Sequence, residues 1–254
     1  MARQVPQSLI QNYVRGINQL SAEMQNALAQ QLALVDYSDF MTAKTRIMAL
    51  MQEYCGIGTT AAGMIARDYY QLVRQYTVDV DDGYEATADS GRVAEATDEA
   101  VKAILQKEVD GKHDQFIRQL IARLDFEIRR ASLDNTAINA KLDPKKPYLQ
   151  RVAQGSETCD FCLMLCSREP SRYMVEHVHA NCDCKLVPVT SMKQIQGYDY
   201  QAAYRRWQDA LTAKAEERAA RHGTTVEQEK AAIIATYENS ARRNRQNARV
   251  RVTN

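Results

Sequence analysis

Apolar residues recur at spacings of three and four along most of the first 140 residues, and this period constrains the fold more than any other feature. The first stripe predicts a helix of several turns; its members are Leu9, Tyr13, Ile17, Leu20, Met24 and Leu28. Further stripes occupy residues 40–55, 59–76, 92–109 and 112–132. We therefore expect a mainly α-helical chain that begins with a helical bundle or a series of helical hairpins.

Glycines and capping residues predict where these helices begin and end. Asp36 or Ser38 can cap the second helix, and Gly56 and Gly58 are expected to break it. Residues 59–76 would then form a separate helix, paired with the second in a hairpin, so that five helices precede residue 140. The acidic segment 77–91 is rich in small and turn-forming residues, which predicts a loop or a short extended piece.

The composition changes at KLDPKKPYLQRV, where two prolines bracket a lysine pair and the following residues are turn-rich and cysteine-bearing. We expect three parts: a helical domain at 1–140, a small α+β module at 141–200, and C-terminal helices at 201–254. The β-branched run at 185–190 predicts a strand in the module. Gly223 should end the helix that carries Trp207, and Thr224 with Glu227 has the spacing of a capping box for the last helix.

Charge and hydropathy exclude several classes of protein. The chain has 33 basic and 32 acidic residues, so no global field draws it to nucleic acid or to a membrane surface. The N-terminal residues lack the features of a signal peptide, and no apolar run is long enough to span a bilayer. We expect a cytosolic protein without a membrane partner. Its thiols would stay reduced, and clustered cysteines then favour a metal or redox site over disulfides.

Five of the six cysteines and two of the four histidines lie between Cys159 and Cys184. A tetrahedral zinc site needs four thiolate or imidazole ligands, commonly from a Cys-x-x-Cys pair and a second pair returned by the chain. Cys159 and Cys162 form the first pair, and His179, Cys182 and Cys184 offer the second. Because five candidates compete for four positions, three thiolates with one imidazole and four thiolates both remain open.

The remaining thiols and imidazoles of the chain need no ligand role. Cys166, in the apolar context LMLC, and Cys55 are expected to be packed thiols, and His177 a surface residue or a neighbour of the site. A thioredoxin-like redox pair is the alternative, but such a site has a single Cys-x-x-Cys with nothing converging on it.

Motifs of catalytic zinc are absent from the sequence. Nucleobase deaminases need His-x-Glu followed by Pro-Cys-x-x-Cys, and zinc proteases need His-Glu-x-x-His, whereas VEHVHA places the glutamate outside the histidine pair. We therefore expect a structural Zn²⁺ that holds a small module together, and no enzymatic activity.

The cysteine segment resembles the phage Mu F-like minor capsid, or head morphogenesis, proteins. The similarity lies in Arg151 and Val152, then ETCDFCLMLCSR, then HANCDCKLVPV, while YCGIGTTAAGMIARDYYQLVR is similar to the helical part of relatives. Relatives often have glycine after the Ser-Arg pair, where this chain has Glu169 and Pro170. The resemblance covers residues 10–190 and assigns the metal positions to the same five residues, Cys159, Cys162, His179, Cys182 and Cys184.

The resemblance implies a structural virion component of a tailed bacteriophage, located in the capsid interior or at the portal vertex and in the host cytoplasm during assembly. It implies that residues 1–140 dock on the portal protein or the inner capsid shell, with a part in DNA packaging or ejection. The alternatives are a metal-stapled HNH-like nuclease and a DNA-binding zinc module. Few histidines remain for nuclease chemistry once zinc is bound, and no basic recognition helix adjoins the cysteines.

The C-terminal stretch ARRNRQNARVRVTN is basic and contains no acid. Its arginines could neutralise phosphates of packaged double-stranded DNA, or they could belong to a solvated helix end, where cations are favoured. These nucleic-acid candidates are Arg242, Arg243, Arg245, Arg249 and Arg251.

Overall fold

The computed structural model describes residues 4–77, 82–88, 93–106, 113–154, 158–172, 184–191 and 194–250. These residues form seven helices and a two-stranded sheet, which confirms a mainly α-helical protein. In chain order the elements are α1 (Gln7–Leu32), α2 (Phe40–Thr77), α3 (Val93–Leu105), α4 (His113–Leu142), β1 (Tyr148–Val152), α5 (Asp160–Cys166), β2 (Lys185–Val189), α6 (Tyr200–His222) and α7 (Val226–Val250).

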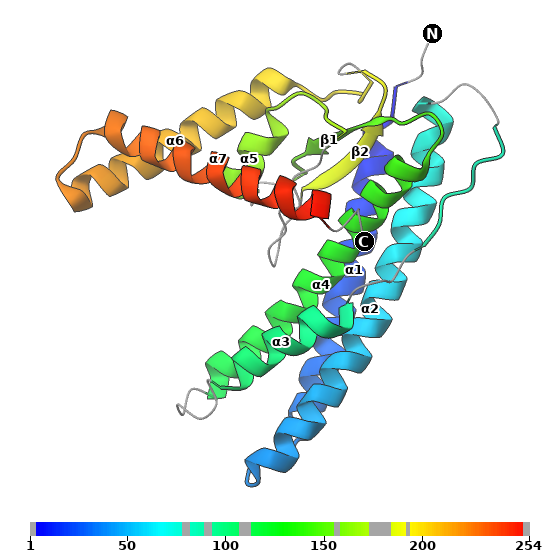
Figure 1. Ribbon diagram of the computed structural model, residues 1–254, viewed down its shortest axis with the longest axis vertical. Coiled ribbons are helices and arrows are strands. Elements are labelled where there is room, and N and C mark those ends of the chain that lie inside the picture. The colour runs from blue at the N-terminus through cyan, green and yellow to red at the C-terminus, as the bar shows by residue number, and fades with distance from the viewer. Residues whose placement is uncertain are drawn as a thin grey trace.

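The long helices α1, α2 and α4 lie alongside one another and form a bundle, and the shorter α3 packs against α2 and α4 (Figure 1). The apolar stripes predicted from the sequence face inward, because burying them removes apolar surface from water. Fully buried members of this core include Ile17, Leu28, Ile47, Leu120 and Leu124. The helical bundle expected within residues 1–140 is therefore present.

α2 is one continuous helix, and the break predicted at Gly56 and Gly58 does not occur. Among the described residues, four helices begin before residue 140, one fewer than predicted. A Cβ atom at Gly58 would lie 2.8 Å from Cγ1 and 2.9 Å from Cδ1 of Ile128 on α4. The glycine therefore permits the close approach of two helices. Its helix propensity, on which the prediction of a break rested, is overridden by this packing.

The cap of α2 also differs from the prediction of Asp36 or Ser38. The backbone N–H groups of Met41 and Thr42 donate to the carboxylate of Asp39, at 3.1 and 3.4 Å. Asp36 accepts a hydrogen bond from the backbone of Ser38 instead, which belongs to the preceding turn.

α4 buries polar side chains as well as apolar ones. Asp125 is 1% exposed; it accepts a hydrogen bond from Ser21 of α1 at 2.5 Å and pairs with Arg129, whose Nε lies 2.8 Å from a carboxylate oxygen. The Tyr13 hydroxyl donates to the Ser132 carbonyl at 3.0 Å, and burial raises the pKa of Tyr13 to about 12. Because lost partners would leave buried polar groups unpaired, these contacts specify the register of α1 against α4.

Strands β1 and β2 form an antiparallel sheet in which Tyr148 pairs with Val189 and Val152 pairs with Lys185. β2 confirms the predicted strand, whereas β1, at the end of the stretch KLDPKKPYLQRV, was not predicted. Val187 and Val189 are buried in the same apolar core as the bundle helices. The division of the chain at residues 140 and 200 remains a prediction.

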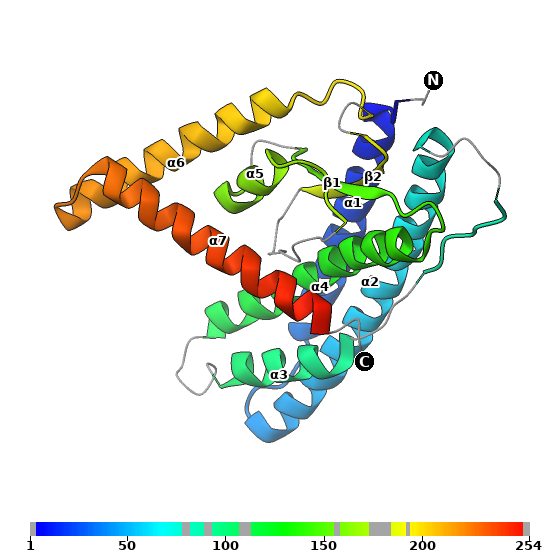
Figure 2. The same ribbon diagram turned by 45° about the horizontal axis from the view of Figure 1, so that its top comes forward.

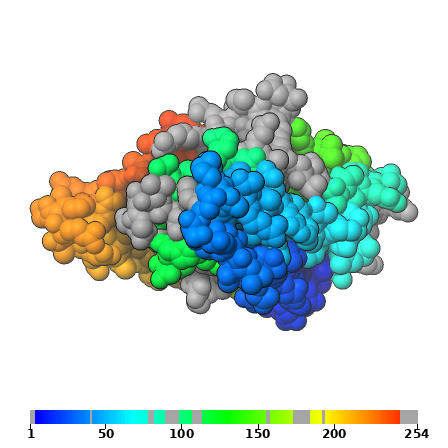
Figure 3. All heavy atoms as spheres, turned by 90° about the horizontal axis from the view of Figure 1, so that it is seen from below, coloured from blue at the N-terminus to red at the C-terminus, as the bar shows by residue number. Residues whose placement is uncertain are grey.

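A second apolar core lies among α5, α6 and α7, where Phe161, Trp207, Leu211 and Ile233 are buried. α6 and α7 form a hairpin that extends from the bundle (Figures 1, 2 and 3). Gly223 ends α6 as predicted, in the left-handed conformation with φ of 69°.

The capping box that begins α7 lies one residue later than predicted. Thr225 and Gln228 exchange reciprocal side-chain to backbone hydrogen bonds, at 3.2 and 3.0 Å, whereas the sequence reading assigned this role to Thr224 and Glu227. Thr224 donates instead to Glu229, at 2.8 Å.

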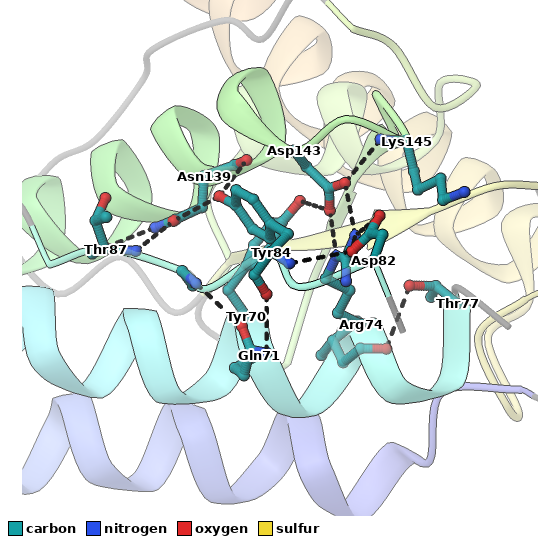
Figure 4. A network of polar contacts seen from close by, with 12 residues as sticks. Tyr70, Gln71, Arg74, Thr77, Asp82, Tyr84, Thr87, Asn139, Asp143 and Lys145 are labelled. Atoms are coloured by element: carbon teal, nitrogen blue, oxygen red, sulfur yellow. Dashed lines mark hydrogen bonds and ion pairs between the residues drawn. The ribbon is translucent and has the colours of Figure 1, made fainter. Parts of the chain in front are cut away.

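Residues 82–88 form the extended piece expected from the sequence, and a buried ion-pair network fixes this segment to the bundle (Figure 4). Arg74 of α2 pairs with Asp143 at 2.8 Å and with Asp82 at 2.6 Å, and Tyr70 donates to Asp143 at 3.0 Å. The Arg74 guanidinium holds the pKa of Asp82 below its usual value. Asp143 is fully buried, so its charge requires these partners.

An amide side chain completes the attachment of this segment. The Asn139 side chain accepts from the backbone of Thr87 at 2.8 Å and donates to the Thr87 carbonyl at 2.8 Å, as a neighbouring strand would. Tyr84 also donates to Asn139 at 3.0 Å. Periodicity does not indicate this network, because Asp143 and Asn139 are more than fifty residues from their partners on α2 and in residues 82–88.

Candidate metal centre

Helix α5 begins at the predicted Cys-x-x-Cys pair and presents its cysteines on one side. Cys159 is the N-cap residue, and its sulfur accepts a hydrogen bond from the backbone N–H of Cys162 at 3.4 Å. Cys162 and Cys166 are four residues apart, one turn of the helix, and both are fully buried. The opposite side of α5, including Phe161 and Leu165, packs in the core shared with α6 and α7.

Cys184 reaches the same place from the residue immediately before β2. It is fully buried and forms one cluster with Cys162 and Cys166, against which Cys159 also packs. The sulfur atoms of Cys162 and Cys184 are 3.4 Å apart. Two thiolates on one tetrahedral zinc ion, each at about 2.3 Å from the metal, would be separated by about 3.8 Å. The observed spacing is close to the one that zinc requires.

Arg151 of β1 adjoins this sulfur pair. Its Nη1 atom lies 2.9 Å from the sulfur of Cys184, and only 3% of the residue is exposed. A buried guanidinium is stabilised by a neighbouring anion, and a thiolate can serve as one. The site thus combines sulfur atoms of α5 and of the residue before β2 with the guanidinium of Arg151 on β1.

Three of the five predicted metal ligands are therefore brought together: Cys159, Cys162 and Cys184. The other two, His179 and Cys182, lie outside the described residues, as does His177. Within the described parts of the chain, no group of three or more His, Cys, Asp or Glu side chains is arranged to hold a metal ion. The contribution of His179 and Cys182 to a metal site therefore stays a prediction.

The two cysteines predicted to be packed thiols are buried, but their surroundings differ. Cys55 lies in the bundle core on α2, and burial, reinforced by the negative charge of Glu127, raises the pKa of its thiol to about 12. A thiol with such a pKa stays protonated and is a poor ligand at neutral pH. Cys166, in contrast, shares the cluster of Cys162 and Cys184, a proximity that its apolar sequence context did not indicate.

The arginine-rich C-terminal stretch is helical as far as Val250, since α7 continues to that residue. Of its arginines, Arg242 is exposed, and Arg243, Arg245 and Arg249 lie on the same helix. Arg251 lies outside the described residues. The part of this stretch that the structure describes is therefore a helix end, which is one of the two readings of the sequence.

The fold and the site define a class of protein: a helical bundle joined through a small sheet to a helical hairpin, with buried cysteines where the sheet meets the hairpin's core. The sequence matches the VG15 protein family over residues 4–210, so the chain belongs to this family of phage proteins. No curated protein and no solved structure matches the chain. None of the helices in the described ranges has the length and apolarity needed to cross a membrane.

Proposed function

We propose that the chain is a structural minor capsid, or head morphogenesis, protein of a tailed phage whose cysteine cluster binds a structural Zn²⁺. The observation that carries the proposal is the convergence of Cys159 and Cys162 with Cys184, across more than twenty residues of chain, in a member of a phage protein family. His179 and Cys182 supply the remaining candidate ligands. A zinc ion would join α5 to the residue before β2, and so add a link to the pairing of Ser171 and of β2 with β1.

Metal analysis tests the zinc site directly. Purified, reduced protein should contain about one zinc per chain, as a closed structural site does. Cys162→Ser should remove most of this zinc, whereas Cys55→Ala, which changes a buried cysteine of the bundle core, should retain it. Fully folded wild-type protein without metal would refute the zinc proposal.

Thermal unfolding of a ligand variant tests what the metal holds together. Cys159→Ser should unfold the part around α5 with little change in the bundle helices. If both parts melt together, the boundary proposed at residue 140 is misplaced.

The proposed partner is the portal protein or the inner capsid shell, with the bundle as the docking part. Ile57 and Met64, seven residues apart on α2, are 52% and 47% exposed, and they offer a partner an apolar surface on one side of this helix. Co-expression with the portal protein of the same phage should give a complex that Met64→Glu weakens. Arg221→Ala, an exposed change on α6, is the control and should leave the complex intact.

The proposal assigns the chain no catalytic role, and it places the protein in the virion, inside the capsid or at the portal vertex. Purified protein should not nick plasmid DNA in the presence of divalent metal ions. Metal-dependent nicking would instead favour the HNH-like nuclease. Mass spectrometry of purified virions should detect the chain.

Contact with packaged double-stranded DNA through the arginines of α7 is a separate part of the proposal. Arg242 is exposed, and the neighbouring arginines continue along the same helix. Binding to duplex DNA should weaken steeply as salt rises, because each phosphate contact releases a counterion. Changing Arg242, Arg243 and Arg245 together to glutamine should flatten this salt dependence.

A further inference from the structure

Arg151 places a charged side chain against the predicted metal ligands. Its Nη1 atom is 2.9 Å from the Cys184 sulfur, and Cys184 in turn lies 3.4 Å from the sulfur of Cys162. All three residues are at most 3% exposed. The arginine therefore meets sulfur in a place from which water is largely excluded.

The sheet register explains how this contact arises. Arg151 pairs with Leu186 across the two strands, and Cys184 lies two residues before Leu186, on the same face of the sheet. The two side chains are thus diagonal neighbours, a separation that a long side chain can span. Because the strands are antiparallel and hydrogen-bonded, the backbone positions of Arg151 and Leu186 are fixed relative to each other.

The negative charge of a zinc–thiolate site makes a neighbouring arginine important. A zinc ion with three or four thiolates carries a net charge of about −1 or −2, and burying that charge is costly unless a cation or hydrogen-bond donors lie close by. Groups that hydrogen-bond to metal ligands orient them and tune the affinity for the metal. Arginine supplies both a positive charge and several N–H donors in a rigid plane.

We propose that Arg151 is a positioning residue of the metal centre: its guanidinium orients the Cys184 sulfur and offsets the negative charge of the metal–thiolate group. This inference rests on the zinc site of the proposed function. On this inference, Arg151 raises the affinity of the site for the metal.

The test compares full-length wild type with Arg151→Met and Arg151→Lys. Zinc affinity is measured by competition with a chromophoric chelator, and the ligand field by the absorption of the Co²⁺-substituted protein. Arg151→Met should bind zinc roughly 10- to 100-fold more weakly, the usual effect of losing an outer partner of a ligand. The sulfur-to-cobalt charge-transfer band should move to lower energy, because the lost hydrogen bond no longer stabilises the sulfur lone pairs.

Arg151→Lys keeps the positive charge but loses the planar set of N–H donors. Its affinity for zinc should therefore lie between those of the wild type and Arg151→Met. It also keeps the proposal testable if Arg151→Met does not fold. The matched control is Arg130→Met, which removes a partly buried arginine from an ion pair with Glu127 in the bundle. This variant should lose stability but keep the affinity and the cobalt spectrum of the wild type.

The outcomes separate the two proposals. If wild-type protein binds no zinc, the metal centre itself is wrong, and the role of Arg151 falls with it. If the wild type binds zinc and both Arg151 variants retain its affinity within about twofold and its cobalt spectrum, the centre stands and the positioning role is wrong.

Discussion

Two glycines of α2, two residues apart, should respond in opposite ways to the same substitution. A Cβ at Gly56 would meet nothing within 4 Å, whereas one at Gly58 would lie 2.8 and 2.9 Å from two atoms of Ile128. Gly56→Ala should stabilise the protein by about 0.5–1 kcal/mol through helix propensity. Gly58→Ala gains the same propensity but must displace a fully buried side chain, which costs about 1–3 kcal/mol.

The two free energies of unfolding should therefore differ by roughly 1–3 kcal/mol, with Gly58→Ala the less stable, because the propensity gain cancels between the variants. Urea titration followed by far-ultraviolet circular dichroism measures the difference. In an Ile128→Ala background, where both contacting atoms are gone, Gly58→Ala should become stabilising. A Gly58→Ala variant as stable as Gly56→Ala would refute the close-packing explanation of the uninterrupted helix.

Other positions carry predictions of their own. Asp143→Asn should lower the free energy of unfolding in urea by roughly 2–3 kcal/mol, less than the usual loss for a broken buried pair because Arg74 keeps Asp82 as a partner. Gly223→Ala should cost about 1 kcal/mol, seen as a lower Tm, because its φ of 69° is unfavourable for alanine; Gly223→Asn should lose less. Hydrogen bonds from Arg74 lower the pKa of Asp82, so its contribution is present above the unfolded pKa of about 4 and is lost as pH falls further. The urea midpoint of Asp82→Asn should accordingly vary less with pH below about 4 than that of the wild type.

Most helices could be predicted from the sequence because their signal is local. The apolar period of α1 and the end of α6 at Gly223 depend on neighbours within a few turns. Caps were predicted less well, since several adjacent polar residues can serve: Asp39 and Thr225 cap where Asp36 or Ser38 and Thr224 were expected. Strand β1 was missed because its partner lies more than thirty residues away.

In the cysteine cluster, too, local sequence signals predicted some of the neighbours and missed others. Spacing alone identified Cys159, Cys162 and Cys184, since zinc chemistry demands paired thiolates, but it separated Cys166 from them. Helical geometry places Cys166 one turn from Cys162 and beside Cys184. The contact of Arg151 with Cys184 follows from the register of β1 against β2. The apolar period of the sequence does not determine that register.

Periodicity and residue type act over a few turns, so they are enough to predict the helical character of the chain, the thiols available near Cys162 and the basic C-terminal stretch. Long-range packing sets three other features: α2 passes through Gly58 unbroken, Arg74 and Asp143 hold residues 82–88 on the bundle, and the Arg151 guanidinium contacts the Cys184 sulfur. Each of these features depends on contacts between residues that are distant along the chain. Such contacts form only when the folded chain packs these residues together and excludes water from them.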